Sequence, residues 1–289
     1  MAYKNSNRSR LGKRFLRHLL AWLAIAFAIF PALYILGTSF NASNSISTTG
    51  IIPQHPTLEH YRSLICDPNH PFFLWTWNTI KVSGITAGAT VFLCALGAYA
   101  LSRFRFRGRR AGLLAVLLVQ MFPQTLGMVA IFLMMAWLSN IVPWLGINTH
   151  SGLILVYLGG AMGFNTWLMK GFFDSIPRSL EESAMLDGAT PFQAFRRIIL
   201  PLSRPILAVV FVIQFIASYS EYMLASILLK GKEMYTLSVG MRLFVTQHYD
   251  DRWGPFAAAG VMGSIIVLIV FYALQRQIVS GLTRGATKG

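Results

Sequence analysis

Charged side chains are scarce in this sequence. Only 12% of its 289 residues are Asp, Glu, Lys or Arg, while 55% are hydrophobic. A water-soluble domain of ordinary composition contains about 25% charged residues. The composition therefore excludes a disordered chain, and a mean hydropathy of +0.55 argues against a water-soluble globule as well.

Motifs for catalysis or metal binding are also lacking. The two cysteines, Cys66 and Cys94, lie too far apart for a metal or redox motif, and the six histidines are scattered. No Gly-x-x-x-x-Gly-Lys-[Ser/Thr] loop is present to bind phosphates, and neither Gly-x-Ser-x-Gly nor His-Glu-x-x-His occurs. We therefore expect a chain that is not an enzyme and that binds no metal or cofactor of its own.

Long stretches without charge are the main positive feature. A helix needs about 20 apolar residues to cross a hydrocarbon layer about 30 Å thick. Turn-forming residues between Ser139 and Thr149 divide the longest uncharged stretch in two. The predicted fold is therefore all-α, a polytopic membrane protein with six transmembrane helices. The six runs are 19–38, 82–101, 113–138, 151–169, 205–229 and 256–274.

These runs divide the chain into a simple order of segments. The first run is longer than the about 7–15 apolar residues of a signal peptide, so we expect an uncleaved anchor. Pro123 is expected to kink the third helix. The predicted segments are a basic tail (1–18), the first transmembrane helix (19–40), an external segment (41–81), a helical core (82–275) that includes an internal segment (177–201) and an external loop (230–255), and a C-terminal tail (276–289).

The distribution of basic residues predicts the orientation. If the N-terminus is cytoplasmic, 19 of the 25 Lys and Arg residues lie on the cytoplasmic side. Basic residues are enriched on that side in membrane proteins. The net charge of +15 therefore indicates topology and contact with anionic lipid rather than binding to nucleic acid, and it predicts that both termini are cytoplasmic.

The segment 177–201 carries two successive signals for the start of a helix. Ser179 with Glu182 forms a capping-box pattern, and Gly188 is expected to end that helix with a positive φ. Thr190, followed by Pro and then by Gln at the third helical position, starts a second helix, which a later proline at 201 is expected to end. Such a pair either lies on the membrane surface or docks onto another protein.

The spacing within this segment resembles the EAA motif of bacterial ABC-importer permeases. That motif reads Glu-Ala-Ala, three residues, Gly, nine residues, Ile-x-Leu-Pro, and this chain departs from it at Ser183, where the family has Ala. Residues 180–195, 205–211 and 281–289 are similar to the smaller permease subunit of maltose/maltodextrin importers, the MalG type. The resemblance assigns ATPase coupling to Glu182, Ser183, Ala184, Asp187, Gly188, Ile198, Leu200 and Pro201.

Several expectations follow from this resemblance alone. The fold is that of a type I, MetI-like permease bundle, in the inner (cytoplasmic) membrane of a bacterium. The partners are a second, MalF-like permease subunit, two MalK-like ATPase subunits that bind ATP and Mg, and an external sugar-binding protein. The function is import of maltose/maltodextrin-type oligosaccharides, with trehalose, another sugar or another small solute as alternatives.

The resemblance also assigns roles outside the coupling motif. The external loop is expected to contact the binding protein, and the C-terminal tail is expected to be flexible alone and to insert between the ATPase subunits. The loop residues are Tyr235, Leu237, Met241 and Phe244, and the tail residues are Gly281, Leu282, Thr283, Gly285 and Lys288.

One acidic residue interrupts the fifth apolar run. Glu221 lies near the outer third of that run, and two readings stay open: its side chain reaches the outer interface, or it faces the bundle interior as a possible gate. An ion-coupled secondary transporter would carry several such groups and internal repeats. This chain has one such group and no clear repeat, so that class is the weaker alternative.

Overall fold

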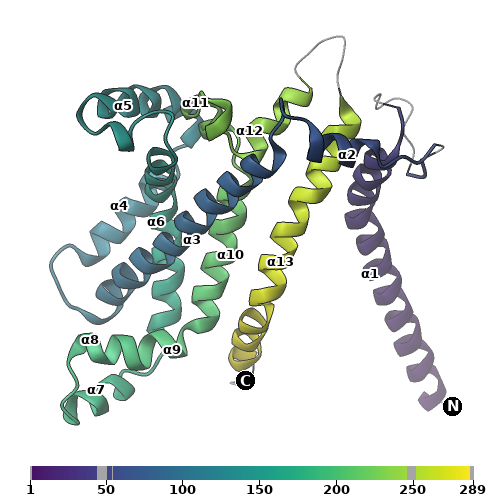
Figure 1. Cartoon of the computed structure of the whole chain (residues 1–289). Helices are drawn as coiled ribbons and strands as arrows, with labels where there is room; N and C mark the ends of the chain where they lie inside the picture. The colour runs from purple at the N-terminus through teal and green to yellow at the C-terminus, as the bar shows by residue number, and fades with distance from the viewer. Residues whose placement is uncertain (1, 44–50, 54, 246–251, 287–289) are drawn as a thin grey trace. The chain divides into compact units, whose positions relative to one another are not determined.

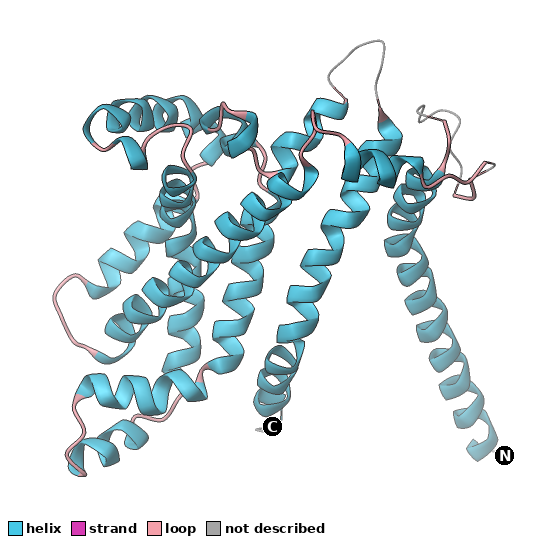
Figure 2. Ribbon diagram, viewed as in Figure 1, coloured by secondary structure: helices cyan, strands magenta, loops and turns pink. Residues whose placement is uncertain are grey.

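The computed structural model describes residues 2–43, 51–53, 55–245 and 252–286. Within these residues every named element is helical, and the extended backbone forms only one isolated bridge, between Asn41 and Pro56 (Figure 2). The predicted all-α class is therefore confirmed. The longer helices are α1 (Ala2–Phe40), α2 (Glu59–Cys66), α3 (Phe72–Arg103), α4 (Arg109–Gln120), α5 (Met128–Ile141), α6 (His150–Asp174), α7 (Ser179–Leu186), α10 (Arg204–Ser220) and α13 (Trp253–Ala286).

Shorter helical turns connect these helices. They are η2 (Gln124–Gly127), η3 (Pro143–Leu145), α8 (Pro191–Ala194), the π-helical turn η4 (Phe195–Ile199), α9 (Leu200–Leu202), α11 (Met223–Leu228), η5 (Lys232–Met234), α12 (Leu237–Met241) and η6 (Arg242–Phe244).

Six membrane-spanning elements are present if bent pairs count as single spans. Among the described residues, four unbroken helices, α1, α3, α6 and α13, are long and apolar enough to cross a membrane. Two further candidates are bent helix pairs, with bends of 78° in 109–141 and 74° in 191–220. The helices also run beyond the apolar stretches that predicted them, and α3 begins at Phe72 rather than near 82.

The third span is broken rather than kinked, which corrects the expectation for 113–138. Helix α4 ends at Gln120, and Pro123 precedes the 3-10 turn η2. Proline lacks an N–H group and disfavours helical backbone in the residue before it, so the chain leaves the helix here instead of bending within it.

The fifth span is also shorter than predicted. The run 205–229 was expected to form one helix, but α10 ends at Ser220, and Glu221 has extended backbone with φ −67° and ψ 128°. A new short helix, α11, starts two residues later. The apolar composition did not predict that α10 and α11 are separate helices, because the residues on both sides of Glu221 are equally free of charge.

The chain forms two compact units, residues 71–240 with 265–289, and residues 1–70 with 241–264. In the larger unit, α3 packs against α6 and α10. Their contact is centred on buried Cys94, Ala98, Met169, Phe173 and Val210. Small side chains on α3 let the helices approach closely, as expected where packing rather than the hydrophobic effect associates helices in a membrane.

The two ends of this helix layer carry different structures. Helices α7, α8 and α9 lie at one end of α3, α6 and α10, while α5 and α11 lie at the opposite end (Figure 1). A second buried cluster, with Val82, Met135, Leu153 and Leu228, forms the core at the α5–α11 end. The smaller unit contains α1, α2 and the first part of α13, and His60 of α2 bonds the Asn41 carbonyl at 2.7 Å.

Candidate functional site

The segment 177–201, called the coupling segment below, folds as two helical pieces joined at Gly188. Gly188 has φ +90°, as predicted, and Thr190 forms a complete capping box with Gln193. The capping box predicted at Ser179 is wrong: α7 begins at Ser179, its N-cap is Arg178, and no side chain caps it. Glu182 therefore stays available on the surface of α7.

The second piece continues past the proline that was predicted to end it. Helix α8 passes into the π-helical turn η4 and then into α9, which contains Pro201. The chain turns instead at Ser203, and α10 follows at 74°. Pro201 follows directly on the π-helical turn η4, and Pro205 lies in the first turn of α10, where the missing N–H of proline is not used.

A buried ion pair fastens the inner side of α7 to the end of α3. Nε of Arg103 donates to Oε1 of Glu181, and the two side chains are only 7% and 4% exposed. The Tyr99 hydroxyl donates to the other oxygen of Glu181 at 3.1 Å and lies 3.2 Å from the Pro191 carbonyl oxygen. Burial of such a pair is tolerated where each group is hydrogen-bonded as well as paired, as both groups are here.

Further hydrogen bonds tie the same region to α3 and α6. Arg103 also donates to the Ile176 carbonyl at 3.0 Å. The Ser102 hydroxyl donates to Asp174 at 2.6 Å, and Arg178 donates to the Ser102 carbonyl at 3.0 Å. The coupling segment is therefore attached to the ends of two long helices, so that a force applied to α7 reaches both.

The outer side of the coupling segment is uncovered. Glu182, Ser183 and Asp187 are exposed. Large apolar side chains beside them are exposed too, with Leu186 at 89% and Phe192 at 64%. Because exposed apolar side chains grouped with polar ones mark interaction surfaces, this side can bind another protein.

The remaining motif residues are divided between the surface and the core. Ala184 and Ile198 are half-buried and Pro201 is exposed. Leu200 packs against the cluster formed by α3, α6 and α10. The motif thus supplies a partner-facing part and a part that anchors the segment to its own bundle.

Glu221 makes contacts inside the bundle and does not extend away from it. Its carboxylate accepts hydrogen bonds from the Tyr157 hydroxyl of α6 at 2.6 Å and from the backbone N–H groups of Leu224 and Ala225 at 2.8 and 3.0 Å. Its carbonyl oxygen accepts a hydrogen bond from Ser238 at 2.7 Å. These contacts favour the reading in which Glu221 faces the bundle interior.

This arrangement, the Glu221 cluster below, lies where two helices separate. The carboxylate accepts hydrogen bonds from N–H groups at the start of α11, just after α10 has ended. A small cavity of about 150 Å³ next to it is lined by Tyr157, Gln214, Ser218 and Glu221 among others. The cluster can hold α6, α10 and α11 in one arrangement and release them together.

Most of the predicted loop residues are covered by the chain itself. Leu237 and Phe244 are 3% exposed, and the Phe244 ring stacks on His70 with centroids 4.7 Å apart. Tyr235 and Met241 are half-buried. Residues 246–251 of this loop lie outside the described residues. Contact with a binding protein by these four side chains stays a prediction, and it requires that Leu237 and Phe244 become exposed.

The C-terminal tail is helical for most of its length, which corrects the expectation of a flexible end. Helix α13 continues through Gly281, Leu282, Thr283 and Gly285 to Ala286. Lys288 lies outside the described residues. Backbone hydrogen bonding offsets the low helix propensity of two glycines when the helix already extends from a long apolar span.

Sequence reasoning did not identify Arg103, Glu181 or Tyr157. Glu181 could have been distinguished from Glu182 only by the face of α7 on which it lies, and the correct start of α7 was not predicted. In the described part of the chain, no group of three or more His, Cys, Asp and Glu side chains is placed to hold a metal ion.

Comparison with known proteins gives the family. Residues 91–284 match the profile described as "binding-protein-dependent transport system inner membrane component". The maltose/maltodextrin transport system permease protein MalG of Vibrio parahaemolyticus is 44% identical over 284 residues, which is 94% of this chain and 95% of that protein. MalG of Escherichia coli K12 is 43% identical over 301 residues, covering 100% and 99%.

Solved structures agree on the fold. A chain of a bacterial ABC transporter involved in the import of the acidic polysaccharide alginate is 25% identical, with a TM-score of 0.76 over 91% of this chain and 95% of that one. A chain of the MetNI methionine ABC transporter, at 17% identity, has a TM-score of 0.53 over 71% and 94%. The chain therefore belongs to the family of binding-protein-dependent transport system inner membrane components, the permease subunits of ABC transporters.

Proposed function

We propose that this chain is one permease subunit of an ATP-driven importer for maltose and maltodextrins. Relatives that match almost its whole length carry that description, at 43% and 44% identity. The fold agrees with it, because ABC-transporter permeases share the helix arrangement. The sugar class rests on the relatives, whereas the coupling role rests on the geometry.

The exposed side of the coupling segment is the observation that carries the mechanism. Its inner side is fixed to α3 through Arg103 and Glu181, and its outer side exposes Leu186 and Phe192 together with Glu182. We assign this surface to an ATPase partner of the MalK type, which binds ATP and Mg, because this chain has no phosphate-binding loop. Two such subunits, a MalF-like second permease and an external binding protein complete the transporter.

Movement would pass from the ATPase to the far end of the bundle. Closure of the ATPase pair pushes α7, the buried ion pair transmits the displacement to α3, and α10 carries it along its 17 residues, about 25 Å, to the Glu221 cluster. Packed helices with two discrete arrangements convert such a push into alternating access. The orientation follows from the basic residues: the coupling segment and both termini are cytoplasmic.

Reconstitution tests this function. The chain is purified with a MalF-like permease and a MalK-like ATPase from the same organism and placed in proteoliposomes. The proteoliposomes are supplied with the sugar-binding protein and with labelled maltose, maltotriose or trehalose. We expect uptake that requires both ATP and the binding protein and that prefers maltose and maltotriose. Uptake driven by an ion gradient without ATP would support a secondary transporter instead, and uptake of trehalose alone would refute the sugar class.

A further inference from the structure

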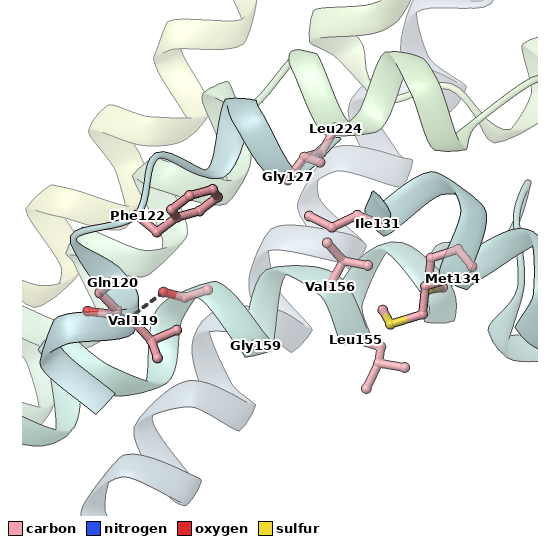
Figure 3. A pocket seen from close by; sticks show the side chains of 12 residues that line it. Val119, Gln120, Phe122, Gly127, Ile131, Met134, Leu155, Val156, Gly159 and Leu224 are labelled. Carbon is pink, nitrogen blue, oxygen red and sulfur yellow. Dashed lines mark hydrogen bonds between the residues drawn. The ribbon is translucent and has the colours of Figure 1, made fainter. Parts of the chain in front are cut away.

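Gln120, the last residue of α4, inserts its side-chain amide into the backbone of α6. Its Nε2 donates to the Gly160 carbonyl oxygen at 2.7 Å, and its Oε1 accepts from the Phe164 N–H at 2.7 Å (Figure 3 shows the Gln120 end of this contact). Residues 160 and 164 are an i, i+4 pair, whose carbonyl and N–H groups an α-helix ordinarily joins. The amide therefore binds both groups of one such pair.

Only a glycine at position 163 leaves room for this contact. A β-carbon on Gly163 would lie 2.7 Å from Cδ and 2.9 Å from Nε2 of Gln120, and 2.8 Å from Cγ1 of Val116. On the same helix, a β-carbon on Gly159 would meet nothing within 4 Å. The requirement for glycine at 163 thus comes from Gln120 and its neighbour on α4 and not from α6 itself.

The contact lies at the point where the third span breaks. Gln120 ends α4, and beyond it the chain turns by 78° into the second half of the span, which contains α5. A cavity of about 330 Å³ next to Gln120 is lined by Ile131 and Met134 of α5 and by Leu155 and Val156 of α6 (Figure 3). The space beside α5 allows its side chains to move relative to α6 while α4 stays in place.

A polar amide within an apolar span is held strongly to its partners. No water is available in the hydrocarbon region to replace them, so leaving α6 would expose the amide and two backbone groups without hydrogen bonds. The α4 end of the span is therefore fixed to α6. The α5 half, which follows the break, packs on α6 through buried apolar side chains such as Met135 and Leu153, and in the described part of the chain no side-chain hydrogen bond joins α5 to α6.

We propose that Gln120 is a positioning residue for transport: it is the pivot that keeps α4 fixed on α6 while α5 changes its angle. The inference rests on the proposed alternating-access function, but it makes a separate structural claim. That claim is that the distance between α4 and α6 stays constant between the resting and ATP-bound states, whereas the distance between α5 and α6 changes.

Spin labels test this structural claim without any measurement of sugar. Cysteines replace the exposed residues Leu114 on α4, Leu133 on α5 and Trp167 on α6, two at a time, in a Cys66→Ser background. Double electron–electron resonance on the reconstituted complex gives both distances with and without ATP. A constant α4–α6 distance with a changing α5–α6 distance is expected. An α4–α6 distance that changes as much as the α5–α6 distance would overturn the proposal, whether or not sugar is transported.

Paired glycine variants test the role of the contact in transport. Gly163→Ala and Gly159→Ala gain the same helix propensity, but only the first displaces the Gln120 side chain. We expect Gly163→Ala to lower uptake by about tenfold, the factor that corresponds to one or two lost hydrogen bonds at the barrier, and to broaden the α4–α6 distance distribution. Gly159→Ala should match the wild type in both measurements.

Direct removal of the amide completes the test. Gln120→Leu keeps the approximate size but loses both hydrogen bonds, so it should reproduce the effect of Gly163→Ala. Combining the two changes should add little to either alone, because each removes the same contact. Equal behaviour of Gly163→Ala and Gly159→Ala, or fully additive effects of Gly163→Ala and Gln120→Leu in complexes that assemble normally, would refute the pivot.

Discussion

Two adjacent glutamates in α7 should have opposite roles, which gives a sharp test of the coupling segment. Glu181 is buried against Arg103, while its neighbour Glu182 is exposed. Glu181→Ala removes one member of a buried pair and leaves the Arg103 guanidinium without its counter-charge. Loss of one partner from such a pair typically costs about 3–5 kcal/mol. Glu182→Ala removes an exposed carboxylate, which normally changes stability by about 0.5 kcal/mol or less.

The cost of losing Glu181 should appear as local opening of the segment. A destabilisation of about 3 kcal/mol raises the population of the opened segment by more than about 100-fold, at about 1.4 kcal/mol for each factor of ten. Trypsin reports this opening, because Arg178, Arg196 and Arg197 lie within or beside the segment and are exposed. The assay compares the rates of cleavage at these sites in the purified permease, resolved by mass spectrometry.

The two variants should separate stability from docking. Glu181→Ala should be cleaved far faster than wild type at these arginines, and Arg103→Ala should behave similarly. Glu182→Ala should be cleaved at the wild-type rate, yet it should bind the ATPase more weakly in co-purification. If Glu181→Ala is cleaved no faster than Glu182→Ala, the buried ion pair does not hold the segment, and the proposed route from α7 to α3 is wrong.

Three further results are expected. Gly188→Asp should weaken ATPase association and abolish transport, because the added side chain separates the two subunits. The chain should still insert, because a β-carbon at Gly188 meets nothing within the chain and the strain at φ +90° costs only about 1 kcal/mol; normal assembly and transport would contradict this. Glu221→Gln should lower uptake more than Tyr157→Phe. The first change removes a charged group that accepts three hydrogen bonds, whereas the second removes one hydrogen bond. Equal uptake by the two variants would exclude a gating role for Glu221. Deletion of residues 281–289 should preserve insertion but lower the ATP hydrolysed per assembled complex, and unchanged hydrolysis would show that the tail makes no ATPase contact.

The sequence predicted the number of spans and the position of the coupling segment because both depend on local properties. Charge-free length determines where a helix can cross a membrane, and the turn at Gly188 depends on one residue that tolerates a positive φ. The capping box at Thr190 is equally local. These features require no knowledge of what the segment packs against.

Local sequence patterns did not predict the tertiary contacts of the coupling segment. Glu181 and Glu182 lie about 100° apart around α7, and which of them is buried depends on how α7 packs against α3. The partners of Glu181 are Arg103 and Tyr99, about 80 positions away in the sequence, and no spacing rule connects them.

Both breaks in the spans have a polar side chain beside them, a feature that mean hydropathy does not measure. Where a helix ends within an apolar region, its freed backbone groups must bind a side chain, because lipid offers no hydrogen bonds. Glu221 does this for the N–H groups at the start of α11, and Gln120, beside the other break, binds backbone groups of α6. A single polar residue in an otherwise apolar run is therefore better interpreted as a sign that the helix ends nearby than as a polar residue within one continuous helix. On that reading, Glu221 predicts the end of α10 at Ser220, and Gln120 followed by Pro123 predicts the end of α4. The apolar runs alone predicted neither helix end.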